Sequence, residues 1–230
     1  MNTRRKQMLV VAALAAAFAG GVYAQTPTTA HAAQIAAARQ ANAALMHHYQ
    51  WNSRVEVVEN GQVKDTRIEL VSYAWNGQLQ RSTLNDQAAR LPIGFLRRSI
   101  QENERQKLQI YLAGLRGLID LYTLPNAGKI YDFIMTAVPA GPDANGQFSL
   151  AGQSIVQPGD SFTLWVNPWT RHPTHAQIIT NFQGDTVNVS ATFATLAAGG
   201  LNYVSFAEAT VPSKSLSVQV QNYDYVRLGN

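Results

Sequence analysis

The chain has 230 residues, 46% hydrophobic and 14% charged, which is the composition of a folded globular protein and excludes general disorder. It contains no cysteine, which excludes a disulfide and a cysteine nucleophile. Three of its 18 basic residues lie in the first six positions, and without them the formal charge falls from +4 to +1. Because the remaining basic residues are scattered among acids, a nucleic-acid-binding surface is not expected.

The first 24 residues have the three parts of a secretory signal peptide. A basic start at residues 4–6 is followed by an apolar stretch at 8–18 and by small residues at positions 22 and 24. The apolar stretch is short for a bilayer span, so we expect cleavage before Gln25; an uncleaved membrane anchor is the alternative. No cysteine follows for acylation. We therefore expect a soluble periplasmic protein without a transmembrane anchor after cleavage.

A short Thr/Pro tether at 25–29 leads into a single domain predicted over residues 30–230. Its first part is an alanine-rich segment with helical spacing, followed by three runs in which apolar and polar residues alternate. The pairs Asn60-Gly61 and Asn76-Gly77 separate these runs and are typical of hairpin turns. The pattern predicts a helix and an antiparallel meander, over residues 30–48, 49–59, 65–75 and 78–84.

The helical period governs the middle of the domain, from residue 92 to 138. Large apolar residues recur three and four positions apart from Leu108 to Tyr122, and Pro92 suits an early helix position. A second apolar pattern from Ile130 to Ala137 predicts another helix, which ends at the proline-rich stretch 139–142.

From residue 146 to 228 the apolar period returns to two. Six alternating runs are separated by Gly, Pro, Asn and Asp, and their short connections favour antiparallel pairing. They are predicted as strands over residues 147–156, 161–166, 176–182, 186–195, 201–210 and 215–228. The predicted fold class is α+β: a large curved antiparallel β-sheet, an incomplete barrel, with helices covering its concave face.

The stretch TLWVNPWTRHPTHAQIIT, residues 163–180, is the first candidate for a metal or catalytic site. His172 and His175 are three residues apart, but Pro168 and Pro173 favour a hairpin loop over a helix. No HExxH pattern and no nearby third ligand accompany the two histidines. We predict no metal site here.

Signatures of enzymes and cofactor-binding proteins are absent from the sequence. It has no GxSxG elbow, no P-loop and no GxGxxG after a strand. We therefore predict no catalytic residue and no cofactor. A hydrolase with an unrecognised acid or histidine site stays an alternative, since it would need only two titratable groups that converge in a cleft.

The order of these elements resembles the LolA/LolB-like lipoprotein carrier superfamily. The resemblance is carried by the leader, the first helix, the meander YQWNSRVEVVENGQVKDTRIELVSY, the helical GLRGLIDLYTL, and the late strands from VNPWTRHPTHAQIIT to SKSLSVQVQNYDY. In that family an incomplete antiparallel barrel closed by helices forms an apolar cavity for acyl chains. The resemblance implies a periplasmic, non-catalytic carrier that binds a lipid or an acylated partner, and the absence of cysteine fits a soluble carrier.

We expect the ligand groove to be lined by large apolar residues of the strands and helices. The candidates are Trp51, Leu70, Tyr111, Leu115, Phe133, Leu164, Trp165, Ile178 and Phe193.

A structural or interaction module of the cell envelope is the second candidate function. Such a protein would have a filled core and no small-molecule ligand, and its exposed tryptophans and Arg171 would contact a partner protein or glycan. The partner expected from the sequence is therefore either a hydrophobic ligand or an envelope protein.

Overall fold

The computed structural model describes residues 29–88, 95–123 and 127–229. The predicted signal peptide, most of the tether and Pro92 lie outside these residues. The described chain begins with helix α2, and its strands are connected mainly by hairpins. The helices are α2 (Thr29–Met46), α3 (Phe95–Asp120), α4 (Ala127–Thr136) and the short 3-10 turns η1 (Leu121–Thr123) and η2 (Pro212–Lys214).

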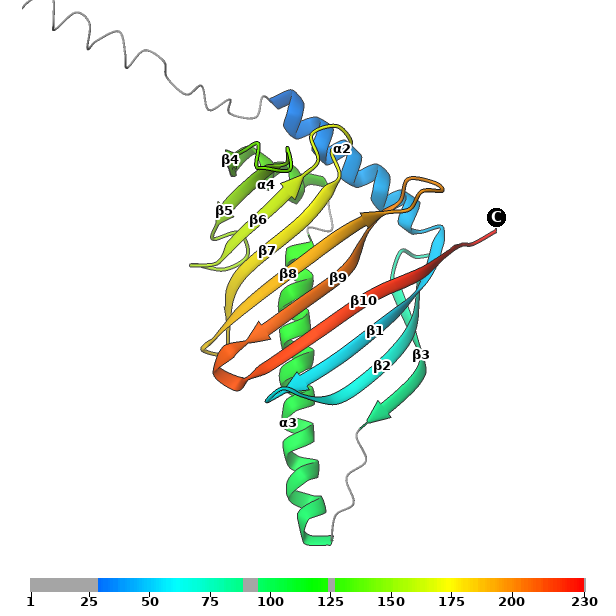
Figure 1. Cartoon of the computed structure of the whole chain (residues 1–230), viewed down its shortest axis with the longest axis vertical. Coiled ribbons are helices and arrows are strands. Elements are labelled where there is room, and N and C mark those ends of the chain that lie inside the picture. Colours follow the sequence, from blue (N-terminus) through cyan, green and yellow to red (C-terminus); the bar gives the residue numbers. More distant parts are fainter. Residues whose placement is uncertain (1–28, 89–94, 124–126, 230) are drawn as a thin grey trace, which may run out of the picture.

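All the described strands belong to one antiparallel sheet that does not close (Figure 1). The strands are β1 (Tyr49–Glu59), β2 (Gln62–Tyr73), β3 (Leu79–Ala88), β4 (Val138–Ala140), β5 (Phe148–Gln153), β6 (Ser161–Val166), β7 (Pro173–Phe182), β8 (Asp185–Thr195), β9 (Asn202–Val211) and β10 (Leu216–Arg227). Their order across the sheet is β3-β2-β1-β10-β9-β8-β7-β6-β5-β4. The last strand therefore pairs with the first, which brings the two ends of the domain together in mid-sheet.

Tight turns fix the register of the meander. Glu59 pairs with Gln62, and the two residues between them, Asn60 and Gly61, have φ of 51° and 72°. Asparagine and glycine tolerate this left-handed backbone better than other residues, so the sequence specifies a two-residue hairpin here. The predicted turn is confirmed.

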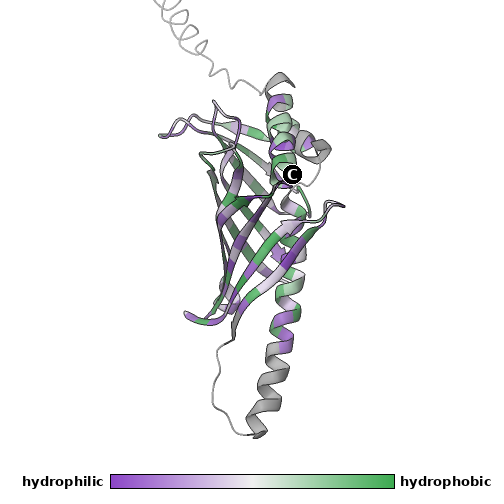
Figure 2. Cartoon of the chain, turned by 90° about the vertical axis from the view of Figure 1, so that its right-hand side faces the viewer, coloured by the Kyte–Doolittle hydropathy of each residue, from purple (hydrophilic) through white to green (hydrophobic). Residues whose placement is uncertain are grey.

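The sheet has one face packed on helices and one open to solvent. Strand alternation directs Leu164 of β6, Ile178 of β7 and Val189 of β8 to the helices, where they are buried. Leu115 of α3 and Ile134 of α4 pack on them and are 2% and 0% exposed. Figure 2 shows the sheet curving on one side of the molecule with α3 along its open side. The predicted α+β class with an incomplete barrel is confirmed.

Helix α2 crosses the end of the sheet at which β1 begins and β10 ends, here called the upper end (Figure 1). Asn42 of α2 donates to the backbone carbonyl of Asn202 at 2.7 Å and accepts from its N–H at 2.7 Å. One side chain thus satisfies both backbone groups at the start of β9, as a neighbouring strand would. The turns at residues 74–78, 167–172 and 196–201 lie at the same end.

In the middle of the chain the structure agrees with one predicted boundary and differs from another. Helix α3 begins at Phe95, close to residue 92 where the helical segment was expected to start, and its first turns extend beyond the sheet (Figure 1). Residues 138–140 form the edge strand β4 rather than the end of a helix. Pro139 is tolerated there because an edge strand pairs on one side only.

A buried carboxylate organises the loop between β5 and β6 at the opposite, lower end of the sheet. Asp160 is 1% exposed and accepts hydrogen bonds from the backbone N–H groups of Ile155, Val156 and Gln157. It also accepts the hydroxyl of Tyr122, just after α3, at 2.7 Å. Burial would raise the pKa of this carboxyl, but these hydrogen bonds outweigh it and lower the pKa below its ordinary 3.8.

We predict that Asp160 stabilises the fold above about pH 4 and loses this effect in acid. A depressed folded-state pKa means that stability is present above the unfolded pKa and falls as the carboxyl is protonated in the native state. Asp160→Asn should lower the free energy of unfolding at pH 7 by about 2–3 kcal/mol and flatten its decline below pH 4. Urea denaturation of the wild-type protein and the variant at pH 7 and pH 3 measures the free energy of unfolding at each pH. Equal losses at the two pH values would contradict the prediction.

Candidate functional site

Six of the predicted groove residues lie together between the sheet and the helices. Tyr111 and Leu115 of α3 and Phe133 of α4 meet Leu164 and Ile178 in one core. Phe193 of β8 packs against the edge of this core. The sequence analysis predicted these side chains as lining of one groove, and the structure places them in or against one apolar cluster.

The other three candidates lie elsewhere. Trp51 is buried but belongs to an aromatic cluster near the upper end of β1, apart from the helices. Leu70 and Trp165 point to the convex face, since their neighbours Val71 and Leu164 are buried on the concave one. Trp165 packs there against His175 of β7, with ring centroids 5.1 Å apart. The concave face thus holds seven of the nine residues proposed for the groove.

Beyond the helices the concave face continues as a strip of small apolar side chains. Ala191 of β8 lies opposite Ala207 of β9, which lies opposite Val220 of β10, which lies opposite Val55 of β1. These four residues, here called the apolar strip, are all half-buried. They form a row across four strands that the described helices cover only in part, so apolar surface stays accessible.

A polar patch adjoins the apolar strip on β1, β2 and β3. Arg67 lies opposite Val55 and pairs with Asp65 at 3.1 Å, while Arg81 pairs with Glu69 at 2.9 Å. Glu69 is 6% exposed. The Ser53 hydroxyl, one Asp65 oxygen and the Arg67 Nε are buried without a hydrogen-bond partner. Such groups carry a desolvation cost, so the polar patch offers donors and an acceptor to a polar group of a ligand.

The sequence analysis did not predict this patch, because it assigned the apolar side of β2, with Leu70, to the groove. The alternation of Ile68 and Leu70 against Arg67 and Glu69 is as predicted, but the charged pair faces the concave side. The register with β1 decides this, since Trp51 lies opposite Val71 and Ser53 opposite Glu69. One signal in the sequence could have indicated the patch. Trp51 and Val57 are apolar residues on one side of β1, and the polar Ser53 lies between them on that same side.

An aromatic cluster closes the concave face at its upper end. Trp51 stacks on Tyr225 at 5.3 Å, and Tyr225 contacts Tyr203 at 4.2 Å. On the other side Trp51 contacts Tyr73, on which His47 stacks at 4.3 Å. Burial raises the pKa of both Tyr73 and Tyr225, so these phenols stay neutral at physiological pH.

Helix α3 is held to the lower end of the sheet by a polar contact. The Tyr111 hydroxyl donates to Asp185 at 3.1 Å, and Asp185 also accepts from Ser213 at 2.6 Å and pairs with Lys214 at 3.3 Å. The Lys214 ammonium lies 5.2 Å from the centroid of the Tyr111 ring. Burial, together with the bond to Asp185, raises the Tyr111 pKa to about 12. This contact, together with the packing of Leu115, would have to break if α3 moved away from the sheet.

The stretch with two histidines is the hairpin turn between β6 and β7. The Asn167 side chain accepts the backbone N–H groups of Trp169 and Thr170, and the Asn167 N–H donates to His172. His175 lies in β7 on the convex face. Within the described ranges no group of three or more His, Cys, Asp or Glu side chains is arranged to hold a metal ion. The predicted hairpin is confirmed.

No protein-family model and no curated protein matches this chain. Among solved structures, it is similar to a DUF1329 family protein from Desulfovibrio piger, at 9% identity over 87% of this chain and 93% of the other, with a TM-score of 0.41. It is also similar to a LolA superfamily protein from Nitrosomonas europaea, at 10% identity over 84% and 93%, with a TM-score of 0.35. At these scores neither likeness identifies a ligand.

None of the helices in the described part of the chain is long and apolar enough to span a bilayer.

We predict that removing one partner of an ion pair in the polar patch destabilises the fold more than removing both charges. Arg81→Ala leaves the Glu69 carboxylate buried without its cation, and because Arg81 itself is partly exposed the expected loss is about 2 kcal/mol. The double variant Arg81→Ala/Glu69→Gln removes the stranded charge and should recover about half of this loss. Urea denaturation of the three proteins measures both effects. A double variant less stable than Arg81→Ala would contradict the prediction.

Proposed function

We propose that this protein is a non-catalytic binder of a lipid or of the acyl chain of a modified partner, which it holds on the concave face of the sheet. The observation that supports this most directly is the apolar strip, Ala191, Ala207, Val220 and Val55. Its side chains are small and half-buried, and they continue the apolar core beneath α3. A hydrocarbon chain laid on this strip would remove its remaining apolar surface from water.

The polar patch suits the other end of such a ligand. An amphiphile with its chain on the apolar strip would place its polar group near Arg67, which lies opposite Val55. The unpaired Ser53 hydroxyl and Arg67 Nε are donors for that group. Apolar and polar surfaces side by side on one concave face favour an amphiphilic ligand over a wholly apolar one.

Entry of a longer chain requires displacement of α3. The helix covers the buried core through Leu115, and Tyr111 fastens it to Asp185. Displacement would break this hydrogen bond, at about 1.5–3 kcal/mol, and would also expose buried side chains such as Leu115, so burial of the ligand would have to offset both costs. The secretory signal expected at residues 1–24 supports a periplasmic location for the proposed activity.

We predict that an acidic side chain on the apolar strip abolishes acyl binding while the same change on the other face does not. Val220→Glu places a charge on the strip, and Ser217→Glu is the matched control, since it lies on the convex face of the same strand. With cis-parinaric acid as a fluorescent probe, Val220→Glu should weaken binding at least tenfold and Ser217→Glu less than twofold. Circular dichroism checks that both variants are folded.

Two results would count against the proposal. One is equal probe binding by folded Val220→Glu and wild-type protein. The other is a mature protein that takes up no probe and shows no acyl species by native mass spectrometry after purification from periplasm without detergent. Either result would favour the second candidate function.

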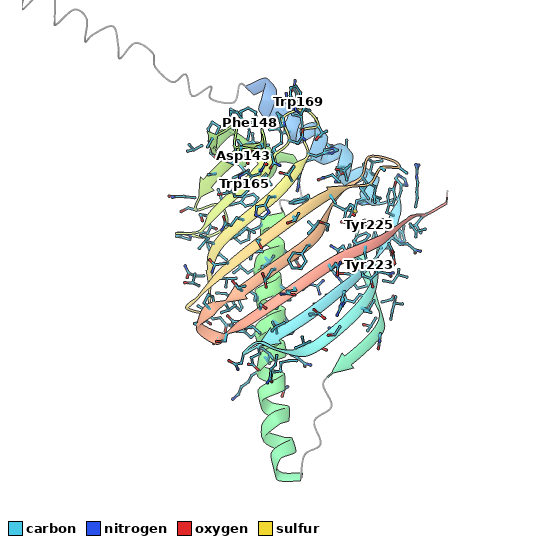
Figure 3. The ribbon with its side chains drawn as sticks, in the orientation of Figure 1. Asp143, Phe148, Trp165, Trp169, Tyr223 and Tyr225 are labelled. Atoms are coloured by element: carbon cyan, nitrogen blue, oxygen red, sulfur yellow. The ribbon has the colours of Figure 1, made fainter. Side chains whose placement is uncertain are left out.

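The second candidate is an envelope interaction module, and two exposed tryptophans favour it. Trp75 and Trp169 are 99% and 89% exposed, in the turns 74–78 and 167–172. Both turns lie at the upper end of the sheet (Figure 3 labels Trp169). Tryptophan is among the residues that contribute most to protein interfaces, and Arg171 follows Trp169 in the same turn.

We predict that Trp75→Ala and Trp169→Ala leave stability unchanged within about 0.5 kcal/mol, because each side chain is almost wholly in water. Trp51→Ala is the matched control and should cost about 3 kcal/mol, since it empties a buried site. Thermal unfolding measures all three. If the double variant Trp75→Ala/Trp169→Ala keeps every cross-link seen with wild-type protein in intact cells, the interaction module is contradicted.

A further inference from the structure

The convex face of the sheet contains a pocket that the acyl-binding function does not use. Its volume is about 380 Å³, and it is lined by Arg54, Thr66, Ile68, Asn85, Gln221 and Tyr223. These side chains alternate with Ser53, Glu69 and Val71, which point to the concave face. The pocket therefore lies on the opposite side of the sheet from the apolar strip.

The strand register builds this pocket. Gln221 of β10 lies opposite Arg54 of β1, Arg54 lies opposite Ile68 of β2, and Ile68 lies opposite Asn85 of β3. One cross-strand row thus forms the floor, and Tyr223 and Thr66 stand in the rows on either side of it. Register shifts interrupt the β1–β10 and β2–β3 ladders beside this row. Such irregularities bend and twist a sheet, which accounts for a hollow on a face of neighbouring strands.

The lining has the chemistry of a site for hydroxyl groups. Asn85 and Gln221 each carry a donor and an acceptor, Thr66 carries a hydroxyl, and Tyr223 has both a ring face and a polar tip. Arg54, the one lining residue with a formal charge, pairs with Glu56 next to the pocket. An anion would therefore have to compete with Glu56, whereas a neutral polyol would meet donors and acceptors together.

We propose that this pocket binds one unit of a neutral saccharide. The hydroxyls would accept hydrogen bonds from Arg54 and would both donate to and accept from Asn85 and Gln221. An apolar face of the sugar ring would lie on Tyr223 and Ile68. The volume is at the lower end of the range for small-molecule sites, which suits a single sugar ring or the end of a chain. Tyr223, labelled in Figure 3, lies on β10 and is half-buried, so part of its ring stays accessible to a ligand.

The test is saturation-transfer NMR on the folded mature protein with maltose, cellobiose and N,N′-diacetylchitobiose, each at about 10 mM because single-ring sites bind weakly. We expect saturation transfer to at least one of the three. Arg54→Ala and Gln221→Ala should each weaken that binding at least fivefold, and Thr163→Ala, on the convex face of β6, should leave it unchanged. Arg54 and Gln221 are exposed, so their removal does not threaten the fold.

The proposal is overturned if none of the three sugars receives saturation, or if Arg54→Ala and Gln221→Ala both bind as wild-type protein does. Inorganic phosphate that shifts the Tyr223 resonances only when Arg54 is present, without sugar binding, would also overturn it and identify an anion site. Binding of cis-parinaric acid by Arg54→Ala reports separately on the concave face. Loss of sugar binding with retained acyl binding therefore separates this pocket from the proposed function.

Discussion

Burial of one face of a ten-stranded sheet beneath few helices is the constraint on which this structure depends. A flat sheet of this width would expose most of that face, whereas a curved one surrounds α3 and α4 with apolar side chains from β5 to β10. Leu115 and Ile134 lie at the centre of this arrangement, and Tyr111 and Tyr122 fix the helical segment to the lower end through Asp185 and Asp160. Stability and coverage of the concave face therefore depend on the same contacts.

Among the described residues, β2 and β3 contribute no side chain to the apolar core beneath the helices, and the concave face there is completed by other means. Rings close its upper end around Trp51, and the Arg67–Asp65 and Arg81–Glu69 pairs lie along β2 and β3. Between this region and α3 lies the apolar strip. The sheet thus has its core at one end, charged pairs at the other and half-buried apolar residues between them, and the proposed binding of an amphiphile rests on this arrangement.

The two faces of β1, β2 and β10 carry different chemistry because alternation separates them. On β1, Ser53 and Val55 point to the concave face while Arg54 points to the convex pocket. A substitution in one site therefore leaves the other largely intact, and the two proposed activities can be measured independently. The two proposals together assign an acyl chain to one face of the sheet and a sugar to the other.

The sequence by itself determined the fold class, the antiparallel pairing and most strands, because alternation and Asn-Gly turns are local signals that tertiary contacts rarely override. It also determined which side of β6 is apolar, with Trp165 opposite Leu164. Only the tertiary structure decided that Arg67 and Glu69, rather than Ile68 and Leu70, face the concave side, since this follows from the register of β2 on β1. The floor of the convex pocket is a second example. Gln221 and Asn85 are far apart in the sequence, and they lie in one cross-strand row only because β10 pairs with β1 in this register. Periodicity gives the faces of a strand, but pairing decides which face becomes the inside of the sheet and which side chains meet across it.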